Sequence, residues 1–562
     1  MNESENQSHH PALAGLVEAL EERRLDRREF LRSATLLGLS AAAAYGMIGA
    51  PPPETGRAAH AATPPVGGTV RISMRVPDLK QPHIFSWVYD SNVLRQSNDY
   101  LTRTGSDNVT RPSLLERWAP APDLRSWTLH LRRDVKWSNG EPLVADHVIW
   151  NMRRWLDPAV GSSMLSLMGA YMLDTVATGE RDEAGQPTTT TRLWSSDAIE
   201  KLDDFTIELH CKRPQLAVPE HLFHYPAVIL HPSEDGEWGE GAIGTGAFRP
   251  VSVETGKRVV LRRNEAYWDE GPYLDELVFI DHGDDPAAAL AALASKQIHG
   301  MYEASTLQYH ALARMDHVEL HTIRSAQTGI ARMQPRAEPF GDPRVRKAMR
   351  LALDTEKLLA IGHLGLGDPG EHHHVAPVHP EYVPLPRHAQ DIEGARRLLA
   401  EAGYPDGFET EIACKKDPAW ELMTVQAMSE MWKAIGVDCR IRVMPSAQYW
   451  DIWTEAPFAF TSWTHRPLAI MTLALAYRTG APWNESAWSS APMDALLARA
   501  EGTLDPDETR AIMREIEMLM QEEGPICQPL WRAVFTPMDK RVKGFQIHPS
   551  YYMFAEQWWL EE

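Results

Sequence analysis

One stretch, residues 127–155, constrains the fold more than any other part of the chain. Its apolar residues first alternate with polar ones, as in a half-buried strand: Trp127, Leu129 and Leu131. The run Ser138-Asn139-Gly140 then predicts a turn, because these residue types tolerate positive φ or bond to their own backbone. The stretch therefore begins as a strand that leads into a tight turn.

After the turn, apolar residues return at helical spacing. From Ala145 they form one face of a predicted helix, with Val148, Ile149, Met152 and Trp155 as its members. The polar residues between them are expected to face water: Asp146, Asn151, Arg153 and Arg154. A strand, a turn and a helix are thus expected in immediate succession.

Short motifs in this stretch resemble the family 5 extracytoplasmic solute-binding proteins of ABC importers, the receptors for peptides, opines and nickel chelates. Trp137-Ser138-Asn139-Gly140 is similar to the family's W/F-x-D/N-G turn, and Ala145-Asp146-His147-Val148 to its A-D-V helix start, with His147 inserted. Further motifs follow in the family's order: Leu202-Asp203-Asp204-Phe205-Thr206, Gly244-Thr245-Gly246-Ala247-Phe248 with Ala247 in place of Pro, Asn264-Glu265-Ala266-Tyr267-Trp268, Arg344-Val345-Arg346-Lys347-Ala348, and residues 396–404.

The resemblance spans nearly all of the chain after its leader, and it implies a fold. We expect an α/β, two-lobed periplasmic binding protein fold of type II and cluster C-like, with discontinuous lobes and an inserted third subdomain. A chain of 562 residues, 43% of them hydrophobic, is long enough for several domains. The expected boundaries are 62–105, 238–328 and 525–562 for lobe I, 106–237 for inserted subdomain II, and 329–524 for lobe III.

Residues 1–61 are predicted to be a signal peptide. Arg27-Arg28-Glu29-Phe30-Leu31 resembles the twin-arginine export consensus, and the apolar run 34–50 is too short for a stable membrane span. An ordinary basic leader is the alternative. Ala59-His60-Ala61 is a candidate cleavage site. Because the first cysteine is Cys211, no lipoprotein anchor is expected, and the product is predicted to be soluble and periplasmic.

The net charge and the cysteine spacing restrict which partners and which cysteine motifs the chain can have. The formal charge of −21 opposes phosphate backbones, so no nucleic-acid partner is expected. None of the four cysteines, Cys211, Cys414, Cys439 and Cys527, shows a C-x-x-C spacing, which excludes a zinc ribbon or thioredoxin motif. Cys414 and Cys439 lie in two strands predicted beside one helix, and either a disulfide or two buried thiols is compatible with that placement.

The segment 391–443 has clear element boundaries. Asp391 and Gly403 predict the start and end of a helix. Strands at 410–414 and 439–443 flank a helix at 420–435, which predicts a βαβ unit with a parallel pair. Earlier in the chain, a turn at 244–248 is expected to feed a strand at 259–263, and residues 174–196 are predicted to form a surface loop or hairpin.

The family resemblance also implies which residues reach the ligand. Peptide receptors of this family carry a cleft tryptophan followed, three positions on, by an aspartate that pairs with the ligand's α-ammonium. Here Trp463 matches the tryptophan, but Arg466 replaces the aspartate. An arginine binds carboxylate or phosphate instead, so we predict an anionic group on the ligand, with a protein carboxylate as the alternative partner. The predicted ligand-binding residues are Ser86, Trp87, Tyr89, Tyr302, Gln334, Trp463, Thr464, His465, Arg466 and Trp483, and Trp87 is as readily explained by core packing.

No catalytic motif such as G-x-S-x-G or H-E-x-x-H occurs in a suitable context, so no catalytic residue and no cofactor is predicted. His372-His373-His374 with His379 is the strongest metal candidate, although imidazoles on a Pro-rich loop more often form a solvated connection. The run 281–285 also contains residue types that bind metals. It is better explained as the start of a helix, with Asp285 as the N-cap and Pro286 as the first helical residue. No metal site is therefore predicted.

Together these features predict a receptor rather than an enzyme. We expect a monomer that captures a small organic solute, peptide-like, opine-like or otherwise anionic, between two lobes and delivers it to the permease subunits of an ABC importer. A metal or metal-chelate receptor, or a metal-assisted hydrolase using His372, His373 and His374, remains the alternative.

Overall fold

The computed structural model describes residues 10–49, 64–85, 88–181, 187–283, 285–386 and 389–561. It divides into two compact units. Unit 1 comprises Met1–Tyr302, Leu312–His321 and Thr536–Glu562, and unit 2 comprises Glu303–Ala311 and Thr322–Phe535. Both are discontinuous in sequence, as in the two-lobed α/β fold that the sequence predicts, while the finer boundaries proposed for three subdomains stay a prediction.

Unit 1 is built on a mixed sheet. In it β1 (Thr69–Ser73) pairs in parallel with β12 (Glu276–Ile280) and β13 (Gly300–Met301), and β12 continues antiparallel into β11 (Arg258–Arg263) and β10 (Phe248–Glu254). The last part of β20 (Leu530–Asp539) joins through the pair Gly300 and Met538. The turn at 244–248 leads directly into β10, a strand that the sequence analysis missed.

That turn packs closely on the end of α4 (Val88–Ser97). The backbone N–H of Gly246 donates to the carbonyl oxygen of Ser97 at 2.8 Å. A Cβ atom on Gly244 would lie 1.9 Å from the same oxygen, and neither glycine has a positive φ. Glycine is needed here because two backbones meet, and not because of an unusual dihedral angle.

A second, antiparallel sheet in unit 1 contains the strand predicted around residues 127–131. Its strand order is β4 (Leu115–Pro120), β5 (Ser126–Leu131), β9 (Thr206–His210) and β8 (Ile199–Asp203). The predicted turn is present with Gly140 at φ +93°, and the predicted helix is α5 (Ala145–Trp155). Trp127 and Trp155 are fully buried, which confirms both predicted apolar faces.

One residue of α5 contradicts the prediction. Asn151 was expected to face water but is fully buried. Its amide nitrogen donates to the carbonyl oxygen of Leu230 at 2.8 Å, and its amide oxygen accepts from the N–H of the same residue at 2.9 Å. A side-chain amide has the same donor and acceptor as a backbone, so Asn151 satisfies a buried loop that no local pattern announces.

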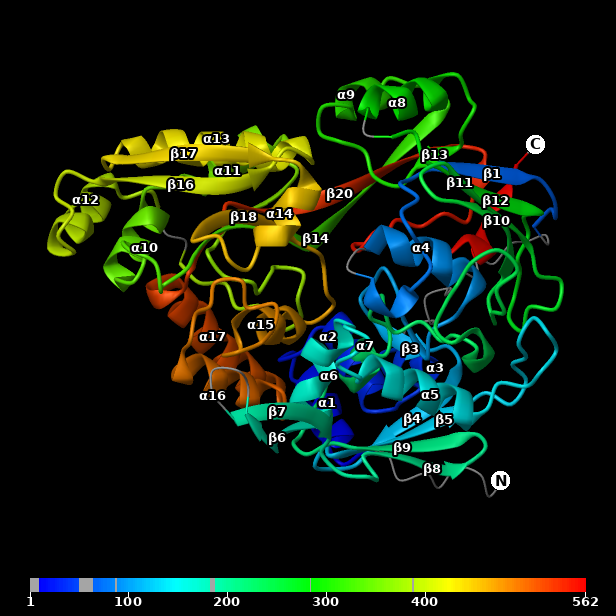
Figure 1. Cartoon of the computed structure of the whole chain (residues 1–562). Helices are drawn as coiled ribbons and strands as arrows, with labels where there is room; N and C mark the ends of the chain where they lie inside the picture. Colours follow the sequence, from blue (N-terminus) through cyan, green and yellow to red (C-terminus); the bar gives the residue numbers. More distant parts are fainter. Residues whose placement is uncertain are drawn as a thin grey trace. The chain divides into compact units, whose positions relative to one another are not determined.

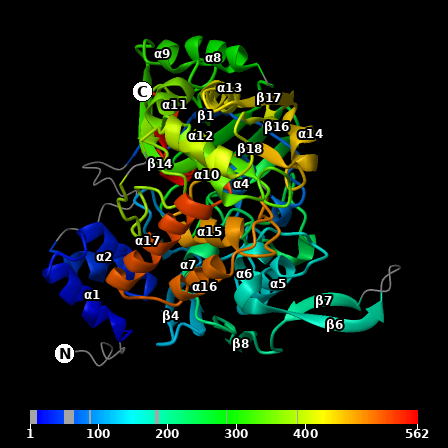
Figure 2. The same cartoon turned by 90° about the vertical axis from the view of Figure 1, so that its left-hand side faces the viewer.

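The predicted insertion at 174–196 is a hairpin. Its strands are β6 (Leu173–Arg181) and β7 (Pro187–Leu193), paired antiparallel, and Figure 2 shows them projecting from the rest of unit 1. The remaining elements of unit 1 include β2 (Thr102–Thr104), β3 (Thr110–Pro112), α6 (Met164–Met172), α7 (Val218–His221), α8 (Pro286–Ala294), β21 (Val542–Lys543) and β22 (Trp559–Leu560). Asp285 caps α8 by accepting from the N–H of Ala287, as predicted.

The N-terminal segment is helical and packs on unit 1, where Figure 2 shows α1 and α2 in dark blue. It consists of α1 (Ala12–Glu21), α2 (Arg27–Leu36) and α3 (Ala41–Met47). The indole N–H of Trp118 donates to the carbonyl oxygen of Leu36 at 2.9 Å. Gly38, at φ +88°, fits against the carbonyl oxygen of Trp118, which a Cβ atom would approach to 2.6 Å.

The arginine pair of the export-like motif starts α2. Asp26 and Glu29 form a capping box there, which holds the first turn. Arg27 and Arg28 are exposed and Phe30 is buried. The predicted cleavage site lies outside the described residues, and the signal peptide stays a prediction. No helix in the described ranges combines the length and the hydropathy that crossing a membrane requires.

Unit 2 is built on a sheet that contains the predicted βαβ unit. β16 (Phe408–Lys415), α13 (Ala419–Lys433) and β17 (Val437–Met444) form it, and the two strands pair in parallel (Figure 1). β18 (Phe458–Trp463) runs parallel to β16 and pairs antiparallel with β14 (Val318–Met333). Because β16, β17 and β18 point the same way, Lys415, Met444 and Trp463 end at one edge, called here the carboxyl edge.

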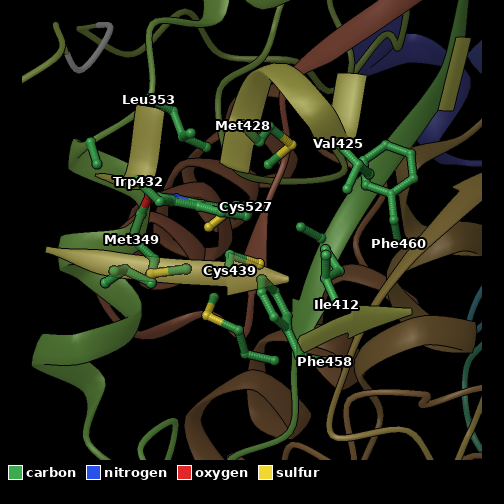
Figure 3. Packing of buried hydrophobic residues seen from close by; sticks show 14 of the residues in the cluster. Met349, Leu353, Ile412, Val425, Met428, Trp432, Cys439, Phe458, Phe460 and Cys527 are labelled. Atoms are coloured by element: carbon green, nitrogen blue, oxygen red, sulfur yellow. The ribbon is translucent and has the colours of Figure 1, made fainter. Parts of the chain in front are cut away.

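Helices cover this sheet, and a dense core lies beneath them. Figure 3 shows Trp432, Met428 and Met349 meeting in it, and the indole N–H of Trp432 donates to the carbonyl oxygen of Met349 at 2.9 Å. Asp391 accepts from the N–H of Gly394, and Gly403 has φ +94°, as predicted for the helix between them. The other elements of unit 2 are α10 (Pro343–Leu351), α11 (Thr355–His363), β15 (Gly367–Pro369), α12 (Ile392–Glu401), α14 (Ser446–Ile452), α15 (Ala469–Tyr477), α16 (Ala491–Ala500), α17 (Pro506–Glu523) and β19 (Ile526–Cys527), while α9 (Tyr309–Leu312) lies at a crossing between units.

The disulfide alternative for Cys414 and Cys439 is wrong. Both thiols are free and buried. The strand register pairs Cys414 with Val443 and Cys439 with Thr410, so the two cysteines are offset by four residues. Four residues of strand correspond to about 13 Å, well beyond disulfide reach.

Candidate ligand-binding site

The predicted ligand-binding residues divide between the two units. Tyr89 on α4 and Tyr302 after β13 lie in unit 1, with ring centroids 6.3 Å apart and nearly perpendicular. Burial raises the pKa of the Tyr89 phenol above its ordinary value, so it stays a neutral hydrogen-bonding group. Tyr302 also contacts Tyr551 at 5.1 Å. Ser86 and Trp87 lie outside the described residues.

The predicted residues of unit 2 gather mainly where β18 ends. Trp463 is the last residue of that strand, at the carboxyl edge, and Thr464, His465 and Arg466 follow it. His465 and Arg466 are 4% and 3% exposed. The short segment that was predicted to choose the ligand is therefore a buried part of unit 2.

Trp463 is held by a buried ion pair. Its indole N–H donates to one oxygen of Glu485 at 2.8 Å, while the other oxygen accepts from Thr461 at 2.6 Å and from Nε of Arg332 at 3.1 Å. The side chains of Arg332 and Glu485 are 0% and 2% exposed. A carboxylate with these partners is already satisfied, so Glu485 fixes the indole rather than offering a charge to a ligand.

Arg332 and Gln334 extend the same support. The guanidinium of Arg332 also donates to the carbonyl oxygens of Ala456 and Trp453. The amide nitrogen of Gln334 donates to the carbonyl oxygens of Thr454 at 2.7 Å and Glu485 at 3.0 Å. Gln334 thus ties two loops together, and its predicted contact with a ligand stays a prediction.

The backbone around Arg466 is held by histidines. Nδ1 of His379 accepts a hydrogen bond from the N–H of Ala376 at 2.9 Å. The proton of this imidazole is therefore on Nε2, which donates to the carbonyl oxygen of Arg466 at 3.0 Å. His465 accepts the N–H of Ala326 at 3.0 Å. The guanidinium carbon of Arg466 lies 5.6 Å from the centre of the Trp463 ring. The side chains of Arg466 and Trp463 therefore lie side by side on a backbone segment that hydrogen bonds hold in place.

The solvated connection expected for His372, His373 and His374 is wrong, because all three are at most 3% exposed. Nδ1 of His372 accepts from the N–H of Gln528, and Nδ1 of His373 accepts from the N–H of Val375. Burial lowers the pKa of His373 and of His374 to about 3, so both imidazoles are neutral at physiological pH. This loop is packed core, stabilised by hydrogen bonds from backbone N–H groups.

Within the described part of the chain, one group of three side chains has the spacing of a metal site: Glu141, His147 and His231. Its hydrogen bonds argue against a cation. Nδ1 of His147 accepts from the indole N–H of Trp137 at 3.0 Å, and Nδ1 of His231 accepts from the N–H of Ser233 at 3.2 Å. Each Nε2 then carries the proton, and that of His231 donates to Glu141 at 3.0 Å.

A buried carboxyl on α17 makes the stability of unit 2 sensitive to pH. Glu517 on α17 is fully buried and accepts the N–H of Val383 at 3.3 Å. Burial, and then the charge of Glu371, raise the pKa of Glu517 to about 8. Because the folded-state pKa lies above the ordinary value of 4.5, the wild-type chain loses stability as pH rises from 4.5 to about 8.

We expect Glu517→Gln to remove that loss. At roughly 1.4 kcal/mol for each pKa unit, the variant should gain a few kcal/mol over the wild type at pH 8.5 and almost nothing at pH 4.5. Thermal unfolding measured across this range checks the difference. Glu515→Gln, on an exposed side chain of the same helix, is the control and should show no such trend. A gain that does not change with pH would contradict the prediction.

The carboxyl edge carries a second buried ion pair that the sequence analysis missed. Lys415 ends β16 and lies 3.1 Å from Glu421, and these side chains are 2% and 0% exposed. The ammonium also lies 3.3 Å from the hydroxyl of Ser462 and 4.6 Å from the centre of the Trp450 ring. Neither member has a local signal, because each is an ordinary charged residue until the fold brings them together.

The family model described as bacterial extracellular solute-binding proteins, family 5, middle, matches residues 110–484. The chain belongs to this family. Membership in this family makes the chain a solute-binding protein rather than an enzyme, as predicted from the sequence.

Known relatives match this chain over most of its length. The periplasmic oligopeptide-binding protein OppA of Haemophilus influenzae is 24% identical over 499 residues, which cover 84% of this chain and 89% of OppA. Two solved structures share the fold: AgaA of A. tumefaciens R10 in complex with agropinic acid (TM-score 0.76, 20% identity, 88% of this chain and 99% of AgaA) and DppA of Helicobacter pylori in complex with the peptide STSA (TM-score 0.73, 20% identity, 89% and 99%).

Proposed function

We propose that this family 5 protein is the periplasmic receptor of an ABC importer and that it captures a small organic solute carrying an anionic group. The observation that carries the proposal is the pair Trp463 and Arg466 at the carboxyl edge of unit 2. Ligands of open α/β sheets bind beyond the carboxyl ends of the strands. Delivery to a membrane permease and a monomeric state belong to the same proposal.

Arg466 supports an anionic ligand rather than a free-amine peptide. A guanidinium repels an α-ammonium and offers two parallel N–H donors to a carboxylate or phosphate. The carboxylate of Glu485 does not replace the missing aspartate, because it is already engaged by Arg332, Thr461 and Trp463. AgaA, which shares this fold, is solved in complex with agropinic acid, and this complex supports an acidic organic solute as the ligand proposed here.

Native mass spectrometry of the freshly purified protein is the direct test, because a receptor often retains its ligand. The retained compound should carry a carboxylate or phosphate. Titration of the ligand-free protein with that compound should then give affinity that falls roughly ten- to hundredfold in Arg466→Ala, the loss expected for a charge-assisted hydrogen bond.

Arg440→Ala is the matched control. Arg440 is an exposed arginine of unit 2, paired with Glu409, and its loss should leave affinity unchanged. Normal affinity of Arg466→Ala for the retained compound, or a retained compound that lacks any acidic group, would contradict the proposal. The metal-chelate alternative gains no support from His372 and His373, whose Nδ1 atoms accept backbone N–H groups.

A further inference from the structure

Four tryptophans of unit 2 form a continuous row of edge-to-face contacts, called here the indole row: Trp450, Trp453, Trp483 and Trp463. Successive ring centroids are 5.6, 6.1 and 6.2 Å apart, with interplanar angles of 70°, 87° and 69°. Trp450 lies on α14 and Trp453 follows it, Trp463 ends β18, and Trp483 lies on the loop before α16. Residues far apart in sequence thus build one aromatic surface.

The row is not ordinary core packing. Trp450, Trp453 and Trp483 are only partly buried, whereas Trp127, Trp137, Trp155 and Trp432 are fully covered. Trp450 and Trp453 pack against a small apolar cluster that includes Met444 and Tyr449. Indoles that are covered on one side and partly open on the other suit a flat apolar partner.

The support beneath the row is rigid. Arg332 donates to the carbonyl oxygen of Trp453 and to Glu485, and Glu485 accepts the indole N–H of Trp463. Gln334 joins the segment after Trp453 to the loop that carries Trp483, through Thr454 and Glu485. Three buried polar side chains, Arg332, Gln334 and Glu485, therefore fix the spacing of three indoles before any ligand arrives, which lowers the entropy lost on binding.

Charges at the two ends show which group the row accepts. The ammonium of Lys415 lies 4.6 Å from the ring centre of Trp450, and the guanidinium carbon of Arg466 lies 5.6 Å from that of Trp463. The outer indoles already carry the protein's own cations, so the row is no cage for a cationic ligand group. The middle pair, Trp453 and Trp483, is left for an uncharged planar group.

Resting on the proposed function, we infer that the ligand carries an aromatic or similarly flat ring besides its anionic group, and that Trp453 and Trp483 bind this ring. Trp483 contacts Trp463 directly, and Arg466 lies beside Trp463. One small molecule can therefore place its ring on the middle pair and its acid near Arg466. The structure thus favours a ring-bearing organic acid over an aliphatic one.

Isothermal titration with two matched probes tests the inference. N-acetyl-L-tryptophan and N-acetyl-L-leucine each carry one carboxylate and no ammonium, and they differ in the planarity of the apolar group. We expect the wild type to bind N-acetyl-L-tryptophan roughly tenfold more tightly, the effect of two additional aromatic contacts. The double variant Trp453→Leu/Trp483→Leu should lose this preference.

Two further variants keep the result interpretable. Trp194→Leu, on an exposed indole of unit 1, should keep the preference, and Trp453→Phe/Trp483→Phe should keep most of it because the planar surface remains. Equal affinity for the two probes in the wild type, a preference that survives in the leucine double variant, or no binding of either probe would overturn the inference. The proposed function fails separately, when native mass spectrometry finds no acidic solute or Arg466→Ala binds it normally.

Discussion

Replacing Glu485 by alanine should destabilise unit 2 by about 3–5 kcal/mol, the cost of leaving a buried charge without its partner. Arg332 is fully buried, and Glu485 is its only ion-pair partner among the described residues. The same substitution removes the acceptors of Trp463 and Thr461. Thermal unfolding should shift downward by roughly 10 °C, and amides of β18 should exchange faster with deuterium.

A double variant separates the ion pair from the packing around it. Arg332→Met combined with Glu485→Leu removes both charges and keeps apolar volume, so it should be more stable than either single variant. Glu409→Ala, which breaks the exposed pair with Arg440, is the matched control and should cost less than about 1 kcal/mol. If the losses of the two single variants simply add in the double variant, the two side chains are not coupled as described.

Gly244→Ala should destabilise unit 1 by about 3 kcal/mol, because the new methyl group would overlap the carbonyl oxygen of Ser97 at 1.9 Å. The backbone cannot retreat without cost, since Gly246 donates to that same oxygen and the N–H of Ser138 donates to the carbonyl oxygen of Gly244. Thermal unfolding and hydrogen exchange of α4 and the turn measure the effect.

Gly239→Ala is the control for that experiment. A Cβ atom at Gly239 would meet nothing within 4 Å, and its φ is not positive, so the substitution should change stability by less than about 0.5 kcal/mol. Equal stability of Gly244→Ala and Gly239→Ala would show that the contact with Ser97 is looser than the structure indicates.

Local signals predicted much of the fold. Asp285 and Asp391 cap the helices that they were predicted to cap, and the βαβ unit around α13 follows from two apolar strands on either side of one helix. These features depend on residues within a few positions of one another, so a single sequence contains them. The hairpin formed by β6 and β7 is of the same kind.

The parts that the sequence analysis missed depend on distant residues. Asn151 pairs with Leu230, 79 positions away, and Arg332 pairs with Glu485, 153 positions away. The buried His372 accepts a hydrogen bond from Gln528, and a long loop brings Trp483 into contact with Trp453. No periodicity marks such partners, because each looks like an ordinary polar or aromatic residue in its own neighbourhood.

Because the N-terminal helices pack on Trp118, cleavage at the predicted site would give the chain a different surface. As long as residues 10–49 are attached, Leu36 occupies the indole N–H of Trp118 and Gly38 covers its carbonyl oxygen. Cleavage at the predicted site would leave both groups to water and uncover apolar surface in unit 1. Removal of the predicted leader would then give this protein a surface that the uncleaved chain does not have.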